Sequence, residues 1–128
     1  MKIIKSPSEL KSNLAKKENI FLIPTMGNLH EGHISLIKEA KKLSKNIVLS
    51  IFINPIQFDS KNDLNNYPRT LSQDINLLKG KGVSILFTPS IKDIYPNEPK
   101  LSYKMPFISN ELCGYSRKGH FKGVITII

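Results

Sequence analysis

The strongest chemical signal in this 128-residue sequence is the pattern His30-x-Gly32-His33. It contains two of the three histidines in the chain, and it closes the segment Pro24–His33, which also carries Gly27. An imidazole N–H beside a phosphate can bind it and stabilise the charge that grows on it during a displacement. Glycines allow close approach of the backbone, and a helix beginning here would add free N–H groups and the positive end of its dipole. The pattern therefore predicts a phosphate-binding site.

Plainer interpretations of the two histidines remain open. One ring could cap the helix while the other lies at the surface, although two histidines around a glycine after a strand favour a ligand site. Metal binding is a weaker alternative, because no carboxylate stands at the spacing of a zinc site. We therefore expect no protein metal site.

A strand and a helix must position this pattern. The apolar run Ile20–Ile23 predicts a short buried strand that Pro24 ends. A helix is expected from Gly32 to about Lys45. Its apolar positions are Leu36, Ile37, Ala40 and Leu43. The run Ile47–Ile53 predicts a second strand, apolar enough to be buried on both faces.

Two capping patterns and one further apolar run predict the other elements. Ser6, Pro7 and Glu9 predict a capped helix running to about Lys17. A second capping box, Thr70–Gln73, predicts a helix with three inward residues and two glycines at its end: Leu71, Ile75, Leu78, Gly80 and Gly82. Val83–Phe87 predicts a third strand, Pro89–Gly123 looks irregular, and Val124–Ile128 has strand propensity.

Strands that alternate with helices predict an α/β fold. Such a chain forms βαβ units, hence a parallel sheet covered by helices on both faces. Ligands of open α/β folds bind at the carboxyl ends of the strands, where the segment Pro24–His33 is expected to lie.

Composition limits the alternatives. Hydrophobic residues make up 40% and charged residues 23% of the chain, which is typical of a globular protein. The single cysteine, Cys113, excludes an intramolecular disulfide, and no apolar stretch is long enough to span a bilayer. We therefore expect a soluble, cytoplasmic protein with no membrane partner. The net charge of +9 comes almost entirely from scattered lysines, which favours a solvated surface over nucleic-acid binding.

Four blocks of sequence resemble one family. The His-x-Gly-His pattern is similar to that of the nucleotidyltransferase superfamily, whose members attack the α-phosphorus of a nucleoside triphosphate. The blocks Pro24–Leu36, Ser50–Phe58, Asp63–Leu71 and Leu112–Val124 resemble, in the same order, those of the pantoate–β-alanine ligases. The resemblance covers nearly the whole chain. It implies a Rossmann-like nucleotidyltransferase fold, a parallel sheet with flanking helices, incomplete at its C-terminus.

The resemblance also implies substrates and residue roles. The substrates would be ATP with Mg²⁺, pantoate and β-alanine, joined through a pantoyl adenylate with release of AMP and pyrophosphate. His33 would be a proton donor and His30 a phosphate partner, both catalytic. The ATP site would comprise Met26, Gly27, Asn28, Leu29, His30, Glu31, Gly32 and His33. Pantoate and β-alanine would meet Gln57, with Asn54 and Tyr67 as neighbours.

Several residues keep structural alternatives. Asn54 could be a turn residue and Tyr67 a packed aromatic, while Arg117 and His120 could either order the mouth of the site or hold a loop. Cys113 is expected to serve packing. Lys118 stands where family members usually have proline, which is expected to loosen that loop.

The length of the chain adds an expectation of its own. Residues 1–128 would be the first part of a nucleotide-binding domain, without the second phosphate loop, the lysine-bearing block and the C-terminal domain of the family. Such a chain is expected to be inactive alone, and the whole enzyme a homodimer. Family likeness makes Val124–Ile128 the start of a helix, and we favour that over its strand propensity.

Three rival functions stay open at this point. A cytidylyl- or adenylyltransferase would use the same histidines with another acceptor, although the blocks Asn54–Phe58 and Tyr67–Thr70 argue against it. A nucleic-acid-binding module would rest on the net charge alone. The third alternative is a non-catalytic fragment of the ligase.

Overall fold

The chain forms two compact units. The computed structural model describes residues 1–98, 117 and 119–127. The first unit, here the sheet unit, consists of residues 1–53 and 68–94. The second, here the η1 unit, consists of residues 54–67 and 95–128.

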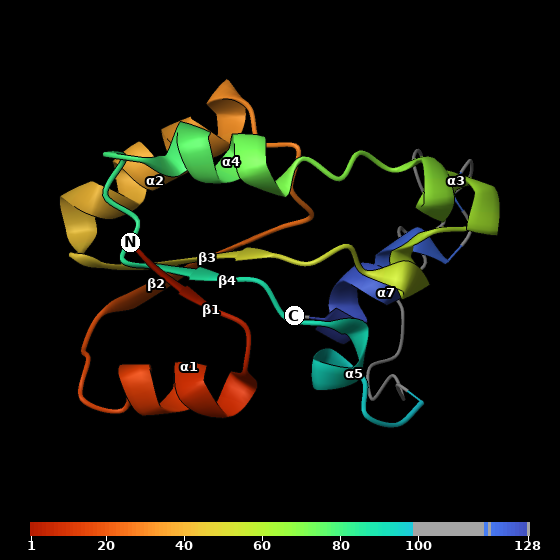
Figure 1. Cartoon of the computed structure of the whole chain (residues 1–128), viewed down its shortest axis with the longest axis horizontal. Helices are drawn as coiled ribbons and strands as arrows, with labels where there is room; N and C mark the ends of the chain where they lie inside the picture. The colour runs from red at the N-terminus through yellow and green to blue at the C-terminus, as the bar shows by residue number, and fades with distance from the viewer. Residues whose placement is uncertain (99–116, 118, 128) are drawn as a thin grey trace. The chain divides into compact units, whose positions relative to one another are not determined.

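A four-stranded parallel sheet is the centre of the sheet unit (Figure 1). Its strands are β1 (Lys2–Ile4), β2 (Ile20–Thr25), β3 (Asn46–Ile51) and β4 (Ile85–Phe87), in the order β1-β4-β3-β2. All three strand pairs are parallel. The predicted parallel sheet is thus confirmed. Strand β1 was not anticipated, because three residues are too few to show a period of two.

Helices cover both faces of this sheet. Helices α2 (Glu31–Leu43) and α4 (Leu71–Leu78) lie on one face, and α1 (Pro7–Leu14) lies on the other (Figure 1). A four-residue helix, α5 (Ile91–Ile94), follows β4. The arrangement confirms the predicted α/β class with helices on both sides of the sheet.

Alternate residues of the strands pack into two separate hydrophobic cores, one on each face of the sheet. Towards α2 and α4 the sheet buries one cluster: Ile23, Ile47, Leu49 and Leu86, with Ile34, Ile37, Ala40, Leu78 and Val83. Towards α1 it buries a smaller one: Ile4, Val48, Ile85 and Phe87, with Leu10, Leu14 and Ile94 packed against it. Strand β3 is therefore buried on both faces, as its continuous apolar run predicts.

The buried face of α2 agrees with the prediction at Ile37 and Ala40 and differs from it at Leu36 and Leu43. Ile34, Ile37 and Ala40 are buried, whereas Leu36 is 56% and Leu43 is 68% exposed. Both faces of α2 carry apolar residues, so spacing alone does not decide which face packs; contact with β2 and β3 does.

Strand β2 also differs from the prediction. It continues through Pro24 to Thr25, and its Ile20 and Leu22 are exposed rather than buried. Because β2 pairs only with β3, it is an edge strand, where a proline without an N–H is tolerated.

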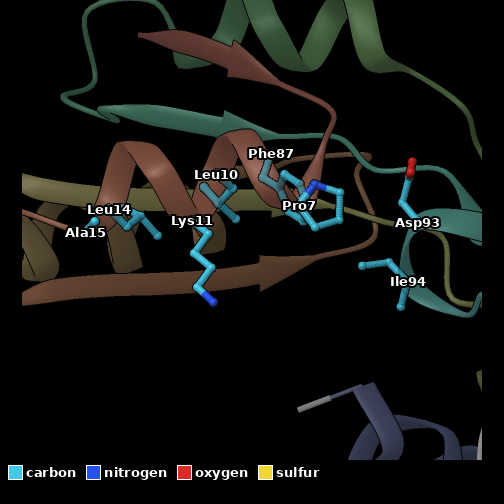
Figure 2. A pocket seen from close by; sticks show the side chains of 8 residues that line it. All are labelled: Pro7, Leu10, Lys11, Leu14, Ala15, Phe87, Asp93 and Ile94. Atoms are coloured by element: carbon cyan, nitrogen blue, oxygen red, sulfur yellow. The ribbon is translucent and has the colours of Figure 1, made fainter.

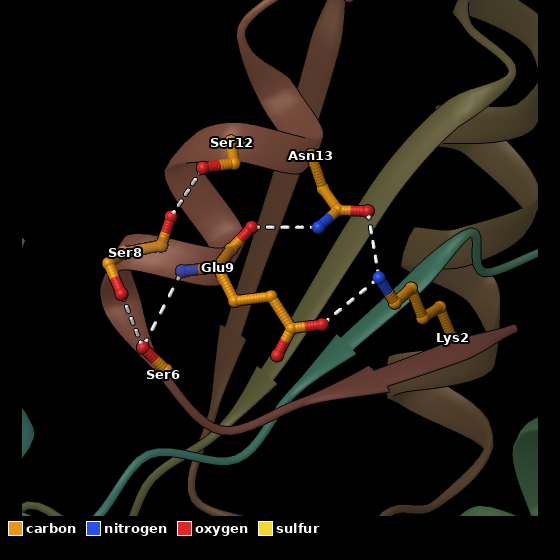
Figure 3. Close-up of polar contacts among 6 residues, drawn as sticks. All are labelled: Lys2, Ser6, Ser8, Glu9, Ser12 and Asn13. Atoms are coloured by element: carbon orange, nitrogen blue, oxygen red, sulfur yellow. Dashed lines mark hydrogen bonds and ion pairs between the residues drawn. The ribbon is translucent and has the colours of Figure 1, made fainter.

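The start of α1 is held by polar contacts to β1 (Figure 3). The Ser6 hydroxyl accepts the N–H of Glu9 at 3.5 Å, so the predicted cap is confirmed. The Glu9 carboxylate does not complete a capping box but pairs with Lys2 Nζ at 3.0 Å. Lys2 also donates to Asn13 Oδ1 at 3.1 Å. These contacts fasten the helix to β1, and α1 ends at Leu14, earlier than expected.

A mainly apolar groove lies beside α1. Its apolar lining comes from α1, β4 and α5, namely Pro7, Leu10, Leu14, Ala15, Phe87 and Ile94 (Figure 2). Lys11 and Asp93 are its only charged lining residues. In the part of the chain that the structure describes, no helix is long and apolar enough to cross a membrane.

The described residues of the η1 unit form a 3₁₀ turn and two helices. These are η1 (Pro55–Gln57), α3 (Lys61–Asn66) and α7 (His120–Ile127). Residues 124–127 are helical, as family likeness implies, and the strand propensity is wrong for them. The helix begins earlier than expected, at His120, so Val124 is not its start and residues 120–123 are not irregular. Gly123 is buried where α7 meets η1: a Cβ there would lie 2.5 Å from the Ile56 carbonyl oxygen and 2.7 Å from Gln57 N.

Candidate functional site

The loop between β2 and α2 is tightly turned and internally bonded. Gly27 and Asn28 both have left-handed φ angles, +81° and +52°. The Thr25 hydroxyl accepts the Gly27 N–H at 3.2 Å and donates to the Ser50 carbonyl at 2.8 Å, joining the carboxyl ends of β2 and β3. Gly27 is required for a packing reason as well, because a Cβ would lie 3.1 Å from Asp74 Oδ2 and from Ile51 Cγ2.

The two histidines cap α2 reciprocally. His30 is the N-cap, and its Nδ1 accepts the Gly32 N–H at 3.1 Å. His33 reaches back, and its Nδ1 accepts the His30 N–H at 3.3 Å. The ring centroids are 4.2 Å apart. The capping interpretation therefore holds for both rings, without excluding a ligand at their other nitrogens.

Gly32 serves the His30 ring. A Cβ at Gly32 would lie 2.9 Å from His30 Cε1 and 3.1 Å from its Nδ1, so any side chain would displace the ring. The expectation of free N–H groups at this helix start is wrong for two residues, because Gly32 N binds His30 Nδ1 and His33 N binds the His30 carbonyl at 2.9 Å. What the helix start presents to a ligand is imidazole.

These contacts select one tautomer. A ring nitrogen that accepts a backbone N–H carries a lone pair, so each neutral ring has its proton on Nε2. Burial, with the charge of His30 in addition, lowers the pKa of His33 below its usual 6.5, and the Asp74 carboxylate partly offsets this. His33 is therefore neutral at pH 7, with an Nε2–H to donate.

The other residues of the segment differ in how they face solvent. Asn28 and Glu31 are exposed, Met26 is half-buried, and Gly27 is buried. The half-buried Leu29 packs against the core beneath α2. Its side chain is thus a structural anchor of the loop.

Sequence reasoning missed Asp74, which binds this loop from α4. Its side chain accepts the Leu29 N–H at 2.8 Å and the Asn28 N–H at 3.1 Å, although 45 and 46 residues separate the partners. Thr70 donates to the same carboxylate at 3.1 Å, and no side-chain cap at Thr70 is formed, so the predicted capping box is wrong. A lone acidic residue within a helical pattern gives no sequence signal for such a contact.

Asn54 and Gln57 form one buried network in the η1 unit. Asn54 is 1% and Gln57 8% exposed. Asn54 Nδ2 donates to Gln57 Oε1 at 2.8 Å and to the Gly123 carbonyl at 3.1 Å, while Asn54 Oδ1 accepts the Tyr95 hydroxyl at 2.9 Å. Asn54 therefore fixes which way the Gln57 amide points: its oxygen is engaged and its Nε2 hydrogens are the donors left for a ligand.

The remaining predicted residues lie in the same unit. Tyr67 packs edge-on against Phe58, with ring centroids 5.3 Å apart. His120 Nδ1 lies 3.0 Å from the Gln57 carbonyl oxygen, and Arg117 is exposed. Cys113 and Lys118 lie outside the described residues.

The described residues offer no protein metal centre. Among residues 1–98, 117 and 119–127, no group of three or more His, Cys, Asp or Glu side chains could hold a metal ion.

The fold and the loop together define the class of protein. A parallel sheet with flanking helices, carrying a His-x-Gly-His loop at the carboxyl end of β2, is a nucleotidyltransferase-like α/β fold. The chain resembles solved structures of this kind. It superposes on a pantoate–β-alanine ligase from Francisella tularensis, solved with "Beta-gamma ATP and Beta-alanine", with a TM-score of 0.92 and 44% identity over 99% of this chain and 50% of that one.

Sequence comparison identifies the family. The family model for pantoate–β-alanine ligase matches residues 2–128, so the chain belongs to that family. The pantothenate synthetase of Methylobacillus flagellatus is 47% identical over all of this chain and 46% of its own length. That of Idiomarina loihiensis is likewise 47% identical, over 46% of its length. The chain thus spans about half the length of these relatives.

Proposed function

We propose that this chain supplies the ATP-binding part of a ligase that condenses pantoate with β-alanine. The observation that carries the proposal is the reciprocal cap, which leaves an Nε2–H donor on each of His30 and His33. Membership of the pantoate–β-alanine ligase family supports it, as does the related Francisella structure with its ATP analogue.

The two imidazoles would act as hydrogen-bond donors to the phosphates of ATP. A neutral imidazole N–H donates without the desolvation that a full charge requires, and it is already oriented by its Nδ1 contact. His33 would stabilise charge on the phosphate in the transition state, and His30 would bind the phosphate beside it. Met26–His33 would form this side of the nucleotide site, with Mg²⁺ arriving on the triphosphate.

Gln57 would bind the carboxylate of pantoate. Its amide oxygen is occupied by Asn54, so its Nε2–H groups are the donors that suit an anionic oxygen. Asn54 would act through Gln57, since both of its N–H donors and one acceptor site of its oxygen are engaged by protein partners. Tyr67 would close the substrate site as a neighbour, and β-alanine would enter after pantoate is activated.

The reaction would run in two steps. The pantoate carboxylate attacks the α-phosphorus of ATP, which forms the adenylate and releases pyrophosphate. The amine of β-alanine then attacks the activated carbonyl, and AMP leaves. Activation is needed because a free carboxylate is a poor acyl donor, and holding the reactants together supplies much of the rate. A cytoplasmic homodimer is the expected setting.

Pyrophosphate release tests this proposal. Residues 1–128 would be joined to the C-terminal half of a relative and supplied with ATP, Mg²⁺, pantoate and β-alanine. We expect pyrophosphate release to require pantoate and AMP release to require β-alanine as well. The 128-residue chain alone is expected to release almost none, because the family's other phosphate-binding residues are needed around the charge.

The same assay separates the ligase from a nucleotidyltransferase with another acceptor. Pyrophosphate release that proceeds without pantoate, in the presence of a phosphate-ester acceptor, would contradict the proposal. Replacing both histidines by asparagine gives the matched inactive control.

A further inference from the structure

Asp74 is a buried carboxylate that the proposed chemistry does not use. It lies in the first half of α4, is 3% exposed, and no other charged side chain of the described residues is buried as fully. Burying a carboxylate is costly unless hydrogen bonds replace its water. A carboxylate at this position therefore has to be compensated by hydrogen bonds from the protein.

Three hydrogen bonds compensate the Asp74 carboxylate. Oδ1 accepts the Leu29 N–H at 2.8 Å, while Oδ2 accepts the Asn28 N–H at 3.1 Å and the Thr70 hydroxyl at 3.1 Å. Two consecutive backbone N–H groups are therefore held immediately before the N-cap His30. Asn28 is in the left-handed conformation, which asparagine tolerates better than most residues, and the bond from its N–H to Asp74 holds it there.

We propose that Asp74 is a positioning residue for the nucleotide: it does not touch ATP but holds the Asn28–Leu29 backbone, and thereby the His30 and His33 rings, in the orientation that binds phosphate. This inference rests on the nucleotide site proposed above. It also assigns the N–H groups of Asn28 and Leu29 to Asp74 and not to phosphate.

The geometry requires a carboxylate and not an amide. Both oxygens accept from N–H donors, and an asparagine has a single oxygen with which to accept. In Asp74→Asn, an NH₂ group must face either the Leu29 N–H or the Asn28 N–H, and one anchor is lost. Asp93→Asn is the matched control. Asp93 is an exposed carboxylate of the same unit, and it accepts hydrogen bonds from the N–H and the hydroxyl of Ser90.

The first test needs no nucleotide. We expect Asp74→Asn to speed amide hydrogen exchange at Asn28 and Leu29, while exchange in β3 and α2 stays as in the wild type. The pKa of His33, followed by NMR of its ring, should fall further, because the carboxylate that raises it is gone. Thr70→Val is a milder variant. The Thr70 hydroxyl helps to hold Oδ2 of Asp74 in place, so without it we expect exchange to speed up at Asn28, which is bonded to Oδ2, more than at Leu29.

The second test measures ATP binding by titration calorimetry on the same variants of the ligase completed with the C-terminal half of a relative. We expect Asp74→Asn to weaken ATP binding roughly 10- to 100-fold, as small misplacements of binding groups do, and Asp93→Asn to leave it unchanged. If the wild type binds ATP and Asp74→Asn binds it equally well, the inference is overturned and the nucleotide site stands. A wild-type chain that does not bind ATP overturns both. If Asp74→Asn does not fold, Thr70→Val decides: unchanged exchange at Asn28 and unchanged affinity contradict the inference.

Discussion

In both histidines at the start of α2, the two ring nitrogens have different roles. Nδ1 accepts a backbone N–H and thereby fixes the ring, while Nε2 keeps the proton. The sequence predicts an imidazole N–H for a ligand but not which nitrogen carries the proton, and it offers capping and ligand binding as alternatives. The geometry makes them compatible, because one nitrogen caps the helix and the other is not used by the cap.

Substitutions at His33 separate the two nitrogens. Asparagine places a polar atom near the Nδ1 position and lacks an Nε2, whereas glutamine places an N–H near the Nε2 position. In the ligase completed with the C-terminal half of a relative, we expect His33→Asn to lower kcat by about 10²–10³-fold, and His33→Gln to lower it less. Circular dichroism controls for folding. Equal losses in both variants would show that donation from Nε2 is not the function of His33.

The lowered pKa of His33 predicts a pH dependence of stability. A group whose pKa is lowered by folding binds fewer protons in the folded than in the unfolded state, so protonation favours unfolding. Its contribution is complete above the unfolded-state value of 6.5 and is lost as the pH falls through the pKa of the folded state. We expect the urea midpoint of the wild type to fall below about pH 6.5 more steeply than that of His33→Gln. Parallel curves would contradict this.

Gln57 should bind through its amide nitrogen. Its oxygen is held by Asn54, so replacing the amide by a carboxylate puts negative charge where the pantoate carboxylate would lie. In the completed ligase, we expect Gln57→Glu to raise the KM for pantoate more than Gln57→Ala does, with the KM for ATP changed less in both. Initial rates at varied pantoate and varied ATP measure this. If the KM for ATP changed more than the KM for pantoate, the assignment of Gln57 to pantoate would be wrong.

Among the elements, the sequence predicts type and order better than faces and ends. Strand β3 is apolar on both faces and was predicted to be buried on both, because its own residues carry that information. For helix α2 the predicted Ile37 and Ala40 are buried, whereas Leu36 and Leu43 are apolar yet exposed. Asp74 was missed for a similar reason: its partners are backbone N–H groups far along the chain, which leave no trace in local spacing.

The contact of α7 with η1 predicts a sensitive glycine. A Cβ at Gly123 would lie 2.5 Å from the Ile56 carbonyl oxygen, so Gly123→Ala must push α7 away and break its bond to Asn54 Nδ2. We expect it to destabilise the chain by about 1–3 kcal/mol, as overpacking does. Lys122→Ala, on the exposed side of α7, is the control. Urea unfolding measures both, and a fully stable Gly123→Ala would contradict this packing.

For the whole molecule, the net charge of +9 does not require a polyanionic partner. The lysines lie mostly on exposed positions, and Lys42 pairs with Glu39 at 2.7 Å on the outer face of α2. A nucleic-acid interface would instead need clustered cations and would lose affinity steeply with salt. The candidate site residues lie at the start of α2 in the sheet unit and in the buried Asn54–Gln57 network of the η1 unit.

The most direct test of the account is an NMR titration of the 128-residue chain with ATP and Mg²⁺, observing the ring nitrogens of His30 and His33. We predict that both rings carry their proton on Nε2 before ATP is added. On binding, the Nε2 signals should shift strongly while the Nδ1 signals, held by the backbone, change little. Rings protonated on Nδ1, or ATP binding that leaves both Nε2 signals unmoved, would contradict the claim that these imidazoles bind the phosphates.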